Sequence, residues 1–86
     1  MAAFENKFET RIRSVLAEHG GLSANATSTS NDANLYDLGM TSHATVSVML
    51  ALEGEFDVEF PDSMLNRSVF ASIASIRDAV VAIGGS

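Results

Sequence analysis

Ser42 is the side chain in this sequence best placed to do chemistry. It lies where a glycine-containing turn, Asp37-Leu38-Gly39-Met40-Thr41, gives way to the apolar pattern of residues 44–56. A serine at the start of a helix can accept a hydrogen bond from a backbone N–H and cap the helix. It can also present an exposed hydroxyl to which a group is attached. The position favours attachment at Ser42, with capping as a possible second role.

Ester hydrolysis is the first alternative for Ser42, because His43 follows it directly and carboxylates are plentiful. A serine nucleophile needs its base within hydrogen-bond reach and a third group to orient that base. Successive residues on a helix diverge by about 100°, so His43 is poorly placed to serve Ser42. His19 is distant in sequence, and no G-x-S-x-G motif is present. We therefore expect that the protein is not an enzyme.

Metal and thiol chemistry are also poorly supported. The two histidines are far apart, and Asp57, Glu59 and Asp62 lack the glycine-containing spacing of a calcium-binding loop. We expect no metal site. The chain has no cysteine, so any thiol that it uses has to come from an attached group.

Composition predicts a single domain over residues 1–86. Hydrophobic residues make up 47% of the chain, as in an ordinary folded domain. The net charge of −6, with only five Lys and Arg, argues against nucleic acid and favours basic protein partners, although acidity can also serve solubility alone. No apolar run approaches the roughly 18 residues that span a bilayer, and the first residues lack the layout of a secretory signal. We expect a cytoplasmic monomer that binds no membrane.

Hydrophobic spacing predicts an all-α fold. We expect a small four-helix bundle, with three main helices and one short helix, over residues 4–19, 42–56, 62–67 and 72–83. Gly20-Gly21 should end the first helix, and Ser72 should cap the last, on which Arg77 and Asp78 should face water. The Ser/Thr/Asn-rich residues 22–34 form a long loop after the first helix. Leu22, Leu35, Tyr36 and Leu38 should tie it to the core.

The second helix has two apolar faces. At about 100° per residue, the core face contains Thr45, Val48, Met49, Leu52 and Phe56. Val46 and Leu50 fall on the other side of Ser42, where they suggest a small docking patch. Scattered surface aliphatics without a role are the alternative.

These residues resemble the acyl carrier protein and peptidyl carrier protein family. The likeness lies in Asp37-Leu38-Gly39-Met40-Thr41-Ser42, Val46, Leu50-Ala51-Leu52-Glu53 and Glu55-Phe56-Asp57-Val58-Glu59-Phe60-Pro61-Asp62. The family pattern is D-x-G-x-D-S-L, followed by a helix ending in A-L-E-x-x-F-x-[IV]-x-[IVF]-P. The direct match covers about half the chain, and the order of helices and loops agrees over nearly all of it.

The resemblance implies that Ser42 receives a phosphopantetheine group from coenzyme A, added by a separate phosphopantetheinyl transferase that depends on magnesium. The terminal thiol of that arm would hold an acyl or aminoacyl cargo as a thioester. The implied partners are this transferase, an acyl- or aminoacyl-activating ligase and a downstream transferase. The surface they recognise would include Thr41, His43, Val46, Ser47, Leu50 and Glu53.

Two departures from the pattern bear on the cargo. Thr41 and His43 stand where the family usually has Asp and Leu, and Ala44 and Ser47 replace charged residues. With Phe60-Pro61-Asp62-Ser63-Met64-Leu65 and Phe70-Ala71-Ser72-Ile73, this pattern resembles the stand-alone bacterial carriers charged with an amino acid by truncated, seryl-tRNA-synthetase-like ligases. The alternative is a degenerate carrier fold that serves as an unmodified interaction module.

Overall fold

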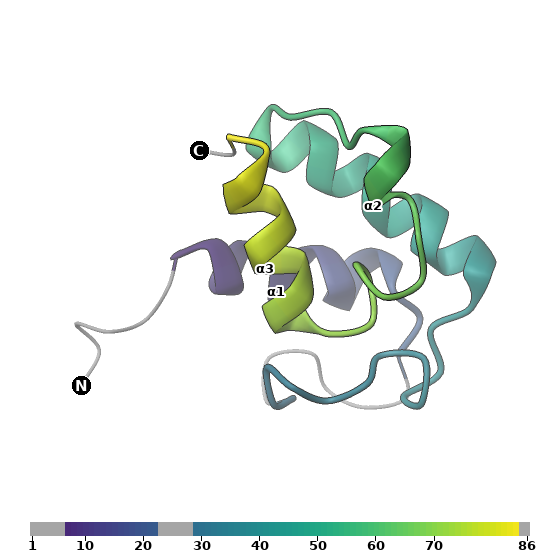
Figure 1. The fold of residues 1–86 in the computed structure, drawn as a ribbon. Coiled ribbons are helices and arrows are strands. Elements are labelled where there is room, and N and C mark those ends of the chain that lie inside the picture. The colour runs from purple at the N-terminus through teal and green to yellow at the C-terminus, as the bar shows by residue number, and fades with distance from the viewer. Residues whose placement is uncertain (1–6, 23–28, 85–86) are drawn as a thin grey trace.

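The computed structural model describes residues 7–22 and 29–84 (Figure 1). These residues form three α-helices and one 3-10 turn: α1 (Lys7–His19), α2 (Ser42–Phe56), η2 (Asp62–Met64) and α3 (Ile73–Ala82). The expected all-helical fold is confirmed. The predicted start of the first helix at residues 4–6 lies outside the described residues, as do residues 23–28 of the predicted loop.

The short third helix is shorter than predicted, because it ends at Met64 instead of residue 67. Leu65 leaves the helical region, with φ −86° and ψ 66°. The side chain of Asn66 then bonds to the backbone on both sides of it. It donates to the carbonyl of Ser63 at 3.1 Å and accepts from the N–H of Val69 at 3.1 Å. Such local bonds from an Asn side chain compete with helix formation. The segment between η2 and α3 therefore consists of turns and bends and not of a helix.

Helix α1 packs against both α2 and α3, and the core lies where the three meet. Side chains from all three helices and from Leu35 are fully buried there: Ile12, Leu16, Leu35, Val48, Leu52, Phe56, Ile73, Ile76 and Val80. The predicted core face of α2 is correct for Val48, Leu52 and Phe56. Thr45 and Met49, which were assigned to the same face, are only half-buried.

Two ion pairs join α1 to its neighbours. Arg11 Nε lies 2.8 Å from Glu55 Oε2 on α2, and Arg77 Nη1 on α3 lies 2.5 Å from Glu9 Oε2. The prediction that Arg77 faces water is therefore wrong: its side chain is 27% exposed. The hydrogen bond to Glu9, and a second one to Asp78, raise the pKa of Arg77 above its ordinary value.

The connection from α1 to α2 is tied to α3 along its described part. Leu35 donates its N–H to the carbonyl of Ala71 at 2.7 Å, and Ala74 donates to the carbonyl of Asn31 at 3.0 Å. Leu22, Tyr36 and Leu38 pack against the core, as predicted. Ser72 caps α3 by accepting from the N–H of Ser75 at 3.1 Å, which confirms its predicted role. These contacts fix the chain just before Ser42.

Candidate functional site

A tight turn over residues 35–40 precedes the start of α2. The N–H groups of Leu38 and Met40 donate to the carbonyl of Leu35 at 3.1 Å, and Gly39 has a φ of 108°. A side chain at position 39 would be strained in that conformation, so glycine suits it. Met40 is buried and anchors the end of the turn. The first residue of α2 is thus held by a folded turn and a buried side chain.

Thr41, and not Ser42, caps α2. Thr41 has extended backbone angles, and its Oγ1 accepts from the N–H of Ala44 at 3.0 Å. Ser42 is the first residue of the helix and is exposed. The suggestion that Ser42 also caps the helix is therefore wrong. Within the described structure its hydroxyl has no hydrogen-bond partner, which leaves the oxygen accessible for chemistry.

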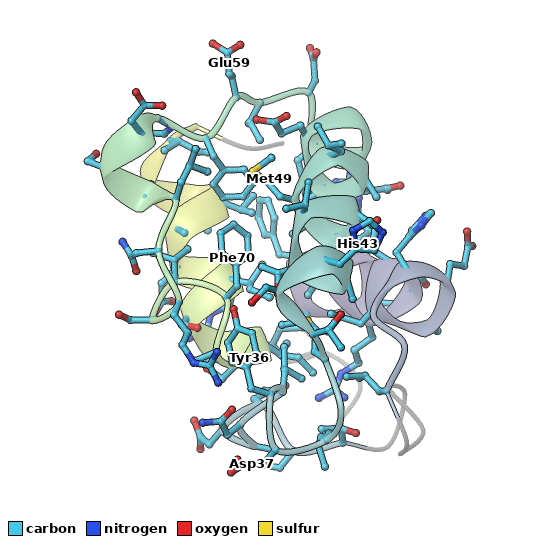
Figure 2. The ribbon with its side chains drawn as sticks, turned by 90° about the vertical axis from the view of Figure 1, so that its right-hand side faces the viewer. Tyr36, Asp37, His43, Met49, Glu59 and Phe70 are labelled. Atoms are coloured by element: carbon cyan, nitrogen blue, oxygen red, sulfur yellow. The ribbon has the colours of Figure 1, made fainter. Side chains whose placement is uncertain are left out.

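Ser42 opens onto a groove of about 360 Å³ between α2 and the wall at residues 65–70. Figure 2 shows Met49, Phe70 and Tyr36 one below the other beside α2, with Tyr36 at the lower end. Most of the exposed surface of the groove is apolar, and Arg67 and Thr45 contact Tyr36. The lining residues are Tyr36, Ser42, Thr45, Val46, Met49, Leu65, Asn66, Arg67 and Phe70.

His43 points elsewhere. It is exposed, does not line the groove, and lies on the other side of α2 from Phe70 in Figure 2. His19 is at the far end of α1, 3.8 Å from Glu18. The described residues therefore present no serine and histidine pair for hydrolysis.

The remaining residues of the predicted partner surface are of two kinds: exposed aliphatic side chains, and side chains that are half-buried or hold the fold together. Val46 and Leu50 are 53% and 58% exposed, large fractions for aliphatic side chains. Thr41 is exposed but holds the helix cap, and Ser47 is half-buried. Glu53 is half-buried too, and its carboxylate accepts from the N–H of Phe60 at 2.9 Å. Val46 and Leu50 thus remain as the apolar surface beside Ser42.

Sequence reasoning did not identify the second wall of the groove. Leu65, Asn66 and Arg67 face Ser42 across it only because the chain returns alongside α2 after η2. One signal in the sequence could have indicated it: Arg67 is the only lysine or arginine between Arg13 and Arg77.

The structure offers neither a metal site nor a membrane span in the regions it describes. No three His, Cys, Asp or Glu side chains within residues 7–22 and 29–84 are grouped so as to hold a metal ion. None of the helices described is both long enough and apolar enough to cross a bilayer.

Comparison with known families bears on the function of the chain as a whole. A family model described as "Phosphopantetheine attachment site" matches residues 10–80, which is most of the chain. The chain belongs to this family of carrier proteins. Family members carry phosphopantetheine and are substrates of enzymes that load them. The accessible, unpaired hydroxyl of Ser42 and the groove beside it fit such a group.

Individual relatives of this carrier protein are known. The aminoacyl carrier protein of Agrobacterium fabrum is 46% identical over 69 residues, which cover 80% of this chain and 83% of that protein. A solved structure of an engineered Bradyrhizobium japonicum glycine:[carrier protein] ligase complexed with the carrier protein from Agrobacterium tumefaciens and ATP contains a similar chain. The two chains are 43% identical, with a TM-score of 0.85, over 88% of this chain and 99% of that one.

A second solved structure contains the loaded form of a relative. It is the Bradyrhizobium japonicum glycine:[carrier protein] ligase complexed with glycylated carrier protein. The similar chain is 29% identical, with a TM-score of 0.75, over 87% of this chain and all of that one.

Proposed function

We propose that Ser42 Oγ carries the phosphopantetheine group and that this carrier protein shuttles an aminoacyl group as a thioester on that arm. The observation that carries the proposal is the exposed hydroxyl at the first residue of α2, which has no partner among the described residues and opens onto a groove. The thiol of the arm supplies the sulfur that a chain without cysteine lacks.

Attachment requires one substitution at phosphorus. The Ser42 oxygen forms a bond to the coenzyme A phosphorus that bears pantetheine. The bond from that phosphorus to the bridging oxygen of the pyrophosphate breaks, and the nucleotide leaves. The serine proton passes to a base on the transferase, because His43 is turned away from the groove. The chain's own contribution is to hold the hydroxyl in solvent at the tip of a rigid helix.

Three partners belong to the proposal: a phosphopantetheinyl transferase, an aminoacyl-activating ligase and a downstream transferase. The ligase has the strongest support, since carrier proteins similar to this one are found complexed with a glycine:[carrier protein] ligase. Val46 and Leu50 provide an apolar surface beside Ser42, with Thr41, His43, Ser47 and Glu53 around it. We also infer a cytoplasmic location and a monomeric state.

Mass spectrometry tests the attachment. Incubation of the purified chain with coenzyme A and a broad-specificity phosphopantetheinyl transferase should add one phosphopantetheine per chain. Ser42→Ala should gain nothing, whereas Ser63→Ala, a control at another exposed serine that lies in η2 and not in α2, should be modified like the wild type. Modification of Ser42→Ala, or none of the wild type, would overturn the assignment.

The aminoacyl cargo needs a second measurement. The modified chain is incubated with ATP, an aminoacyl-activating ligase and single amino acids. Gain of one aminoacyl mass that is lost again on treatment with hydroxylamine indicates a thioester. Partner binding that is the same in the wild type and Ser42→Ala, with no modification of either, would favour the unmodified interaction module.

A further inference from the structure

Arg67 differs from the other arginines of this chain. Each of the other three uses its guanidinium in bonds to another part of the protein: Arg11 to Glu55, Arg13 to Asn31, and Arg77 to Glu9. Arg67 makes no ion pair with any residue that the structure describes. Its guanidinium carbon lies 3.8 Å above the centre of the Tyr36 ring. It is therefore a positioned cation whose N–H donors remain available.

The aromatic platform under Arg67 is itself fixed to the start of α2. The hydroxyl oxygens of Tyr36 and Thr45 lie 3.3 Å apart, within hydrogen-bond distance. Thr45 Oγ1 also donates to the carbonyl of Thr41 at 2.8 Å. A short series of contacts thus joins Arg67 to the residue before Ser42. Stacking and these bonds reduce the conformational freedom that Arg67 would lose on binding an anion.

Ser42 and Arg67 line the same groove. The amino end of α2 adds to the positive potential there, because the first intrahelical bond runs from the N–H of Thr45 to the carbonyl of Thr41. The N–H groups of Ser42 and His43 precede it and carry the positive end of the helix dipole. A negative charge on Ser42 Oγ would therefore face both an oriented cation and a helix terminus.

We propose that Arg67 binds the phosphodiester of the arm attached to Ser42 and so holds the first part of that arm against the groove. This inference rests on the proposed function, since it requires Ser42 to be modified. A phosphodiester carries one negative charge and accepts two parallel bonds from a guanidinium. The apolar side chains on both sides of the groove then offer the rest of the arm a surface to follow: Val46 and Met49 on α2, and Leu65 and Phe70 opposite. Arg67 is a positioning residue and takes no part in bond formation.

Nuclear magnetic resonance of the modified protein tests this directly. We compare the wild type with Arg67→Gln and Arg67→Lys, each checked by mass for complete modification and by backbone spectra for an intact fold. In the wild type, the Nε–Hε resonance of Arg67 should shift between the unmodified and modified forms. The ³¹P resonance should shift in Arg67→Gln and less in Arg67→Lys, and isotope-labelled pantetheine amides should become more mobile in Arg67→Gln.

Salt provides an internal control. At 1 M salt, where charges are screened beyond about 3 Å, exposed contacts weaken, so the ³¹P difference between wild type and Arg67→Gln should shrink. Full modification with identical ³¹P shifts and arm mobility in all three proteins would overturn the inference while leaving the proposed function intact. Slower modification of Arg67→Gln with unchanged ³¹P spectra would assign Arg67 to the transferase contact instead, and would also overturn it. Failure of the wild type to gain the arm would overturn the proposed function itself.

Discussion

The carboxylate of Glu53, near the end of α2, accepts a hydrogen bond at 2.9 Å from the backbone N–H of Phe60, which lies in the loop after the helix. The carbonyl of Glu53 also accepts from the N–H of Val58 at 3.1 Å. Asp57, between the helix and Val58, has a left-handed conformation with φ 54°. Glu53 thus fixes the turn after α2, which leads the chain toward residues 65–70 on the other side of the groove.

Glu53→Ala should therefore destabilise the fold, whatever role Glu53 has toward partners. Losing a charged acceptor and leaving the N–H of Phe60 unpaired should lower the free energy of unfolding by about 2 kcal/mol. Urea denaturation measures this loss, and faster hydrogen exchange at the Phe60 amide should locate it.

Glu59→Ala is the matched control, because Glu59 is an exposed acid in the same loop and points away from the helices in Figure 2. Its removal should change stability by less than about 0.5 kcal/mol. Equal stability of the two variants would show that the Glu53 bond adds nothing to the fold.

The sequence predicted those parts of the fold that depend on local periodicity. The expected bounds 42–56 coincide with α2, because its buried residues recur at helical spacing and Thr41 provides a cap. Arg77 was assigned to solvent because a helical wheel contains no information on Glu9, which is 68 positions away in sequence. The groove escaped prediction for the same reason: Tyr36, Ser42 and Arg67 come from three separate segments.

Stability measurements can test whether Thr41, and not Ser42, caps α2. Thr41→Ala removes the acceptor of the Ala44 N–H and should cost about 1 kcal/mol of stability, whereas Thr41→Ser should retain most of it. Ser42→Ala should leave stability within about 0.5 kcal/mol of the wild type, because the Ser42 hydroxyl has no partner in the described structure. Thermal or urea denaturation of the unmodified proteins is sufficient. If Ser42→Ala lowered the free energy of unfolding as much as Thr41→Ala, Ser42 would be a helix cap after all.

Leu50 gives the clearest test of the partner surface. It is 58% exposed and does not line the groove, so changing it should not disturb the arm, whereas Val46 does line the groove. Burying a leucine side chain in an interface contributes about 1.5–3 kcal/mol, and a buried unpaired aspartate adds a penalty. Leu50→Asp should therefore lower kcat/KM for aminoacylation by the ligase at least about tenfold, since tenfold corresponds to 1.4 kcal/mol.

Val81→Asp is the control for that experiment. Val81 is 54% exposed and lies on α3, so it is a branched aliphatic residue with nearly the same exposure as Leu50 but a different position. We expect Val81→Asp to be aminoacylated at the wild-type rate, and both variants to unfold at urea concentrations close to that of the wild type. If the two substitutions slowed aminoacylation equally, the effect would come from added negative charge on an acidic protein. The docking surface would then lie somewhere other than on this face of α2.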